Sequence, residues 1–166
     1  TVICIVTVLT ISFLMLLNGT KIDSPAAQTI NRPAPDFSLP SLNGQLITLQ
    51  NLRGKPVLIN FWTTWCGPCE AEMPLLEAAS KKYGTDLAII AINQGEGLSD
   101  VQKFVSAENL TFQILLDEKY DVGDLYKIGG YPTSVFIDKE GMIQAIYLGE
   151  LSSKQLKNNL RMIGIK

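Results

Sequence analysis

The alternation of hydrophobic and polar positions divides the chain into three stretches. Residues 1–20 carry no charged side chain and are almost continuously apolar. Residues 21–35 include Lys, Asp, Ser, Asn and Arg, contain three prolines and show no apolar periodicity. From residue 36 to residue 166, short apolar runs alternate with amphipathic stretches, and this length suits one folded domain. We therefore expect a front segment, a tether over 21–35 and a single domain over 36–166.

Within the domain, the apolar pattern predicts an α/β fold. Two apolar pieces at 37–39 and 46–49 flank Asn43-Gly44, which suits the tight turn of a hairpin. The later predicted elements are a strand over 57–62, a helix over 66–83, a strand over 87–93, a helix over 100–108 with Ser99 as its N-cap, a strand over 112–115, a short helical stretch over 119–126, strands over 134–137 and 142–148, and a helix over 152–163. This order predicts parallel strands joined by helical crossovers, then an antiparallel pair, in one central mixed sheet flanked by helices.

The front segment allows three interpretations. Crossing a bilayer takes roughly 20 apolar residues, so residues 1–20 suit an uncleaved transmembrane signal anchor. A cleaved signal peptide is the second interpretation, with Ser24-Pro25-Ala26 as a poor cleavage site. A buried core helix is disfavoured, because the segment is uniformly apolar rather than striped. We favour the anchor, and both membrane interpretations place the domain outside the cytoplasm.

Two cysteines stand at the junction of a predicted strand and a predicted helix, in the pentapeptide Trp65-Cys66-Gly67-Pro68-Cys69. A helix N-terminus favours an anion, so Cys66 is the thiol best placed to ionise and to attack a disulfide. Cys69, one turn deeper, would resolve the resulting mixed disulfide. Gly67 and Pro68 keep the first turn tight, and proline is tolerated there because its missing N–H has no helical partner. The spacing therefore indicates a reversible Cys66–Cys69 disulfide.

Three other interpretations of the cysteine pair are weaker. A structural zinc site needs four ligands, but the chain has no histidine and its third cysteine, Cys4, lies in the front segment. Covalent haem attachment needs histidine after Cys69, where Glu70 stands. A purely structural disulfide stays open, although so small a ring constrains little of the unfolded chain.

Glu72 is the candidate proton carrier. It lies three residues after Cys69, on the same face of the predicted helix. A partly apolar environment would raise its pKa and let it exchange a proton with Cys69. Spacing alone leaves open that Glu72 is a solvated carboxylate, as we expect for Glu70. The segment 93–97, which is rich in glycine and follows a strand end, is interpreted as a plain loop.

The pentapeptide, together with Pro74 and with Tyr131-Pro132-Thr133 before a strand, resembles the active site and the cis-proline loop of the thioredoxin superfamily. More closely, the chain resembles the membrane-anchored TlpA/ResA-type bacterial thiol-disulfide oxidoreductases. This closer resemblance rests on Ala34-Pro35-Asp36-Phe37, the Asn-Gly hairpin, Gly54-Lys55-Pro56 and Phe61-Trp62-Thr63-Thr64-Trp65-Cys66. It covers nearly everything from Arg32 onward and implies a thioredoxin-like fold.

The resemblance also implies roles for individual residues. Pro132 would be cis, and the main chain of Tyr131 would pair with an extended substrate segment. Glu72 matches an active-site glutamate, and Pro74 would kink the helix. The substrate-binding and supporting residues implied in this way are Trp65, Gly67, Pro68, Tyr131, Pro132 and Thr133.

Two positions separate the chain from related classes. Asn60 stands where cytosolic thioredoxins carry a buried aspartate, and a neutral amide cannot act as a general base. The chain also resembles the opening of peroxiredoxins, but their Pro-x-x-x-Thr-x-x-Cys motif would need proline at Ile59. Thr63 alone does not make a peroxidase.

The leading hypothesis is a protein-disulfide reductase tethered to the bacterial cytoplasmic membrane by a single span, with its catalytic domain outside the cytoplasm. Expected partners are disulfide-containing client proteins, for instance apocytochrome c during cytochrome c maturation, and a membrane electron-donor protein. No metal, nucleic acid or cofactor beyond the Cys66–Cys69 disulfide is expected. The alternatives are a disulfide oxidase or isomerase, and a binding module or chaperone without turnover. The Gly67-Pro68 pair favours a reductant.

Overall fold

The computed structural model describes residues 30–166 of the chain. The predicted anchor over 1–20 and residues 21–29 of the predicted tether lie outside these residues. Within residues 30–166, no helix combines the length and the apolar character that crossing a membrane requires.

A five-stranded mixed sheet in the order β5-β4-β3-β6-β7 forms the centre of the domain. The strands β3 (Val57–Trp62), β4 (Ala88–Gln94) and β5 (Gln113–Asp117) run parallel, and β6 (Thr133–Ile137) and β7 (Ile143–Leu148) are antiparallel. Every residue of β3 is buried, as a run that is apolar except for Asn60 predicts for a central strand covered on both faces. The predicted α/β class and mixed sheet are confirmed.

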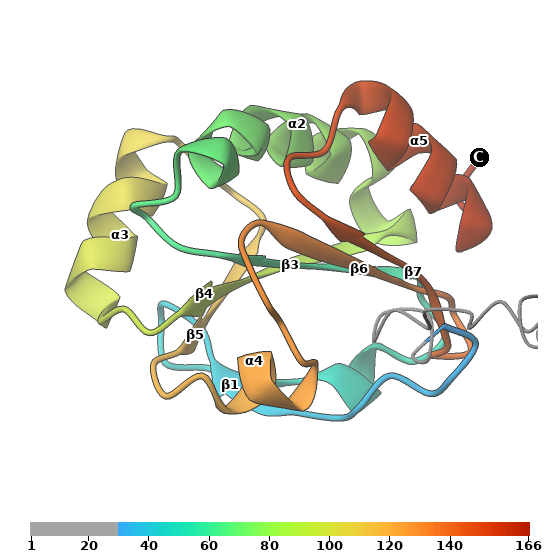
Figure 1. Cartoon of the computed structure of the whole chain (residues 1–166), viewed down its shortest axis with the longest axis horizontal. Helices are drawn as coiled ribbons and strands as arrows, with labels where there is room; N and C mark the ends of the chain where they lie inside the picture. The colour runs from blue at the N-terminus through green and yellow to red at the C-terminus, as the bar shows by residue number, and fades with distance from the viewer. Residues whose placement is uncertain (1–29) are drawn as a thin grey trace, which may run out of the picture.

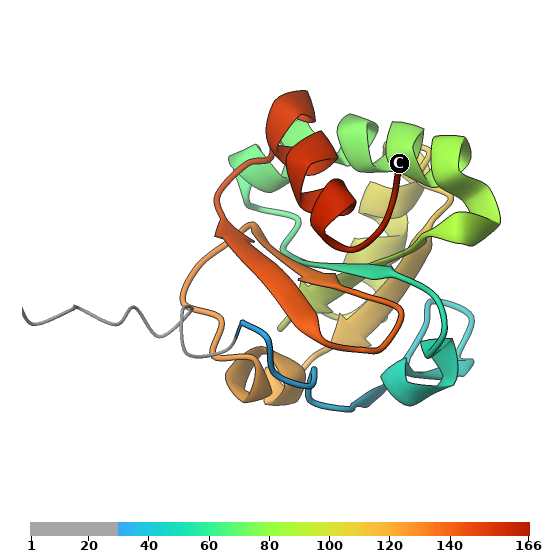
Figure 2. The ribbon, with the colours of Figure 1, turned by 90° about the vertical axis from the view of Figure 1, so that its right-hand side faces the viewer.

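The helices cover the two faces of the sheet unequally (Figures 1 and 2). Helices α2 (Gly67–Tyr83), α3 (Leu98–Ala107) and α5 (Ser153–Met162) pack on one face, and the short α4 (Asp121–Leu125) lies on the other with the N-terminal hairpin. A hydrophobic core lies on each face of the sheet, and successive side chains of β3 pack into the two cores in turn. Leu58 and Trp62 face α2, whereas Ile59 and Phe61 face α4. The sheet is therefore the middle layer of three.

The predicted hairpin consists of β1 (Ser38–Pro40) and β2 (Leu46–Thr48), followed by the 3-10 turn η1 (Leu49–Leu52). Gly44 takes a φ of 80° in the connection, whereas Asn43 stays outside the left-handed region, so Gly44 alone supplies the positive φ of the predicted turn. A bridge from Ser41 to Leu115 joins the hairpin to the edge strand β5. The hairpin thereby covers a sheet edge.

Most predicted element ends agree with the structure to within two residues, but one cap is wrong. Helix α3 begins at Leu98 with Gly97 as its N-cap, so Ser99 lies inside the first turn. Glu96, the residue before Gly97, is fixed by hydrogen bonds from Thr64 and Asn93, and the helix begins directly after Gly97. By contrast, α5 begins as its sequence predicts, because Ser152 and Gln155 form a capping box. A further 3-10 turn, η2 (Gly84–Asp86), follows α2.

Candidate active site

The two cysteines occupy the start of α2, directly after β3. Cys66 is the N-cap of the helix and forms a disulfide with Cys69, with 5.2 Å between their Cα atoms. The backbone N–H of Cys69 donates a hydrogen bond of 3.2 Å to the Cys66 sulfur. In the reduced protein the same N–H and the helix dipole would stabilise a Cys66 thiolate. The predicted cysteine pair is therefore assembled as a disulfide at a helix N-terminus.

The attacking cysteine, Cys66, is largely buried. Its exposed fraction is 6%, and that of Cys69 is zero. As an N-cap, the Cys66 side chain folds back over the first turn of α2, which turns its sulfur away from solvent. Gly67 and Pro68 fill the first two helical positions and are exposed, while α2 continues through Pro74. A client disulfide therefore has to reach Cys66 at close range, beside these two residues.

The loop before β6 provides the opposite wall of the site. The Tyr131-Pro132 peptide bond is cis, as the resemblance implied. The Pro132 carbonyl accepts a hydrogen bond of 2.8 Å from the Gly149 N–H, and the Thr133 hydroxyl donates one of 2.7 Å to the Gly130 carbonyl. Among residues 30–166, the main-chain groups of Tyr131 have no hydrogen-bond partner. This strand-like segment is held from behind and offers free backbone groups.

An exposed aromatic pair links this loop to the cysteine loop. The rings of Trp65 and Tyr131 meet edge to face, with 6.1 Å between their centroids. Trp65 keeps 71% of its surface exposed, an unusual degree for the largest apolar side chain. The pair forms an apolar rim on the side from which a client would approach.

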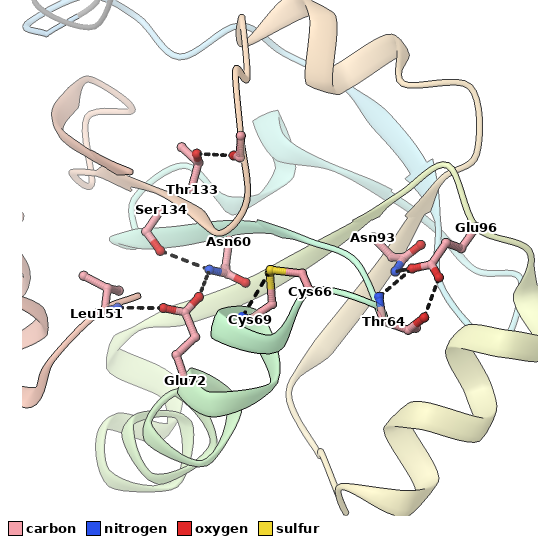
Figure 3. Close-up of a disulfide and its surroundings, with 11 residues drawn as sticks. Asn60, Thr64, Cys66, Cys69, Glu72, Asn93, Glu96, Thr133, Ser134 and Leu151 are labelled. Carbon is pink, nitrogen blue, oxygen red and sulfur yellow. Dashed lines mark hydrogen bonds between the residues drawn. A yellow bond between two sulfur atoms is a disulfide. The ribbon is translucent and has the colours of Figure 1, made fainter. Parts of the chain in front are cut away.

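Glu72 is buried behind the disulfide, with 1% of its surface exposed. One carboxylate oxygen accepts from the Asn60 amide at 2.7 Å, and the other accepts from the Leu151 N–H at 2.9 Å (Figure 3). Burial raises the pKa of Glu72 from 4.5 to about 7, and the two hydrogen bonds oppose this rise only in part. The structure thus favours the proton-carrier interpretation of Glu72 over the solvated one. Glu70 is exposed, as expected.

Asn60 connects Glu72 to the sheet. Its side chain has no exposed surface, and its amide nitrogen donates both to Glu72 and, at 3.1 Å, to the Ser134 hydroxyl. The other amide atom, Oδ1, has no hydrogen-bond partner among the described residues. The sequence indicated that position 60 replaces a buried carboxylate by a neutral amide. The structure adds that this amide fixes the position of the carboxylate on α2.

Glu96 is the site residue that sequence reasoning missed. It lies in the segment 93–97, which we interpreted as a plain loop, but its carboxylate contacts the cysteine loop (Figure 3). It accepts from the Thr64 N–H at 2.7 Å, from the Thr64 hydroxyl and from the Asn93 amide at 2.7 Å. A carboxylate just beyond the carboxyl end of a parallel strand is the signal that could have found it, because ligand-facing loops gather there.

The assembled groups suit thiol-disulfide exchange. The dithiol lies at a helix N-terminus, and a carboxyl with a pKa of about 7 lies behind it. The Trp65–Tyr131 contact joins the cysteine loop to the loop in which the main-chain groups of Tyr131 are unpaired. Residues 30–166 contain no group of three histidine, cysteine or acidic side chains placed to hold a metal ion. A peroxidase motif would need proline at position 59, where β3 places the fully buried Ile59.

Comparison with known proteins agrees with this chemistry. The family model described as AhpC/TSA matches residues 30–146. The thioredoxin-like protein YneN of Bacillus subtilis is 42% identical over 130 residues, which are 76% of this chain and 76% of that protein. The thiol-disulfide oxidoreductase ResA of Geobacillus thermodenitrificans is 38% identical over 138 residues, 82% of this chain and 79% of that protein. A Chlorobium tepidum structure assigned as thiol:disulfide interchange protein DsbE superposes with a TM-score of 0.76 at 29% identity, over 81% of this chain and 98% of that one.

Proposed function

We propose that this chain, which belongs to the AhpC/TSA family and is a thioredoxin-like thiol-disulfide oxidoreductase, reduces disulfides of client proteins outside the cytoplasm. The observation that carries the proposal is the Cys66–Cys69 disulfide with Glu72 buried behind it and with a pKa of about 7. A carboxyl with that pKa holds or releases a proton at physiological pH, and a resolving thiol needs such a partner.

The reaction begins with the Cys66 thiolate, which attacks one sulfur of the client disulfide. A bond forms between Cys66 and that sulfur, and the other client sulfur leaves as a thiolate. The Cys69 thiol then loses its proton to the Glu72 carboxylate, and the Cys69 sulfur attacks Cys66. The second client thiolate departs, so that the client gains two electrons and Cys66–Cys69 becomes a disulfide.

The direction of electron flow is inferred from the residues between the cysteines. Thioredoxin, which is similar in having Gly-Pro there, has a potential of about −270 mV, whereas the oxidant DsbA has about −120 mV. Gly67 and Pro68 therefore favour a reductant, although groups outside the motif also change the potential.

The proposed location and partners rest on the sequence and on the names of relatives. Residues 1–20 suit a transmembrane anchor, and relatives named ResA support a ResA-type role. In that role the client would be a protein with two nearby cysteines, such as apocytochrome c. A membrane electron-donor protein would then return two electrons to the Cys66–Cys69 disulfide after each turnover.

Titration of the protein against glutathione tests the reductase assignment. We expect a potential well below that of strong oxidants, within roughly 50 mV of the thioredoxin value. A potential near about −120 mV would contradict reduction and assign the protein to disulfide formation. Cys66→Ser should abolish activity in either case, and full complementation by that variant would favour a chaperone without turnover.

The client can be identified with Cys69→Ser. This variant lacks the resolving thiol, so the mixed disulfide on Cys66 persists and its partner can be sequenced. We expect proteins with paired cysteines, and the same experiment with Cys66→Ser is the matched control. Recovery of apocytochrome c with the first variant but not with the second would support a cytochrome role.

A further inference from the structure

The oxygen of the Asn60 amide has no role in the proposed thiol-disulfide exchange. Asn60 lies in β3 with no exposed surface, and Oδ1 makes no hydrogen bond to any of residues 30–166. Buried polar atoms in proteins are nearly always paired, because an unpaired one loses its bonds to water without replacement. An unpaired acceptor directly behind the disulfide therefore calls for a physical explanation.

The direction of this oxygen is fixed by the rest of the side chain. An ionised Glu72 carboxylate only accepts hydrogen bonds, so it pairs with the NH2 group of Asn60, at 2.7 Å, and this group also reaches Ser134 at 3.1 Å. Figure 3 shows the Asn60 side chain between the Glu72 carboxylate and the two sulfur atoms, with its oxygen on the sulfur side. Cys69 and Glu72 occupy successive turns of α2, and both are buried.

We propose that Asn60 Oδ1 accepts a hydrogen bond from the Cys69 thiol in the reduced protein. Asn60 is then a positioning residue that holds Cys69 and Glu72 in one hydrogen-bonded unit. Reduction breaks the S–S bond with two electrons and two protons. One of these protons binds the Cys69 sulfur, which thereby becomes an S–H donor. The acceptor that is unpaired in the disulfide form is satisfied in the dithiol form, so Asn60 stabilises the dithiol selectively.

This inference rests on the proposed thiol-disulfide exchange and adds a division of labour to it. Asn60 is neutral and cannot take a proton, but it directs the S–H bond of Cys69. When Cys69 resolves a mixed disulfide, its proton goes to Glu72, its electron pair forms the bond to Cys66, and the client thiolate leaves. Oδ1 then loses its donor, which returns the site to the state that the structure describes.

The test is the equilibrium constant with glutathione for Asn60→Leu. Leucine has a similar volume but neither donates nor accepts, so the variant loses the bond that exists only in the dithiol form. The proposal keeps the Asn60–Glu72 bond in both redox forms, so the loss of that bond cancels in this equilibrium. A net hydrogen bond of ordinary strength predicts a shift of about threefold to tenfold toward the disulfide. Tenfold corresponds to a potential about 30 mV more negative.

Ser134→Ala is the matched control. It removes the other partner of the Asn60 amide but leaves Oδ1 in place, so its equilibrium constant should stay within about twofold of wild type. If Asn60→Leu does not fold, Asn60→Ala replaces it with the same expectation. Thermal unfolding of both redox forms is measured alongside.

Two outcomes overturn the inference. An unchanged equilibrium constant, with both redox forms equally destabilised, would make Asn60 a purely structural residue. A shift toward the dithiol would show that Oδ1 does not bind the thiol. Neither outcome concerns clients or the direction of electron flow, and a wild-type potential in the oxidant range would overturn the reductase proposal without touching this inference.

Discussion

Two glutamates flank the disulfide, and their surroundings give them different tasks. Glu72 lies behind the disulfide on α2, with 1% of its surface exposed and two hydrogen-bond donors. Glu96 lies in the loop before α3, is half-buried, and has three donors. Figure 3 shows the two carboxylates on opposite sides of the cysteines.

The difference shows how burial decides what a carboxylate can do. At Glu72, desolvation outweighs two hydrogen bonds, and its pKa of about 7 lets it exchange protons near neutral pH. At Glu96, the carboxylate accepts from the backbone and hydroxyl of Thr64, so it fastens the segment that leads to Cys66. In the proposed mechanism, one carboxylate carries a proton and the other holds the loop in place.

The largest effect is expected for Glu72→Gln. The amide cannot take the Cys69 proton, so resolution of a mixed disulfide at pH 7 should slow by about 100-fold or more. The rate in wild type should rise with pH through about 7, and the variant should lose this dependence. Stopped-flow release of client thiol from pH 5 to 9 measures both. Identical pH profiles in the two proteins would return Glu72 to a structural role.

The free energy of unfolding should depend on pH through the Glu72 carboxyl. The pKa of Glu72 is about 7 in the folded protein, whereas an ordinary solvated glutamate has 4.5, so the native state binds this proton more tightly than the unfolded state. The tighter proton binding at Glu72 adds about 3 kcal/mol to the free energy of unfolding. This stabilisation is complete below pH 4.5 and is lost as pH rises to about 7. Urea unfolding of wild type and Glu72→Gln from pH 4 to 8 should show that difference. A constant difference between the two proteins would contradict the raised pKa.

Glu96→Gln should have a smaller effect of another kind. It weakens the charge-assisted bonds to Thr64, so we expect a loss of about 1–2 kcal/mol of unfolding free energy and a several-fold slower exchange. The pH profile of the exchange should keep its shape, because Glu72 is untouched. Glu70→Gln, at an exposed position of α2, is the control and should change neither quantity. A displaced pH profile in Glu96→Gln would contradict the purely structural role of Glu96.

Trp65→Ala should leave stability within about 0.5 kcal/mol, because the side chain is largely exposed. We expect the KM for a protein client to rise several-fold, since the apolar rim with Tyr131 is lost. Reduction of a small disulfide that cannot span the rim should be unaffected and provides the comparison. Equal effects on both substrates would place Trp65 in the chemistry rather than in client binding.

The parts of the site that are local in sequence could be predicted, and those that depend on tertiary contacts could not. The run Val57–Trp62 and the cysteine spacing are enough to predict a buried strand with a dithiol at the following helix. The donor that Leu151 provides to Glu72 comes from 79 residues further along the chain, so the spacing of Cys69 and Glu72 left the burial open. The role of Glu96 depends in the same way on a contact across 32 residues.

The burial of Cys66 and the start of α3 have two different causes, and residue type reveals neither of them. An N-cap side chain folds back over its helix, and this is decided by cap geometry rather than by residue type. Gly97 caps α3 without a side chain, because Glu96 is already fixed by Thr64 and Asn93. Serine at position 99 has the stronger intrinsic preference for the cap, and the tertiary contact overrides it.

The pKa of Glu72 itself tests the contrast between the two glutamates most directly. The carboxyl carbon can be followed by NMR in the disulfide form of protein labelled with 13C-glutamate, with Glu72→Gln identifying its signal. We predict a midpoint at about pH 7. A midpoint near 4.5, the value of an ordinary solvated glutamate, would contradict the proton-carrier role on which the proposed mechanism depends.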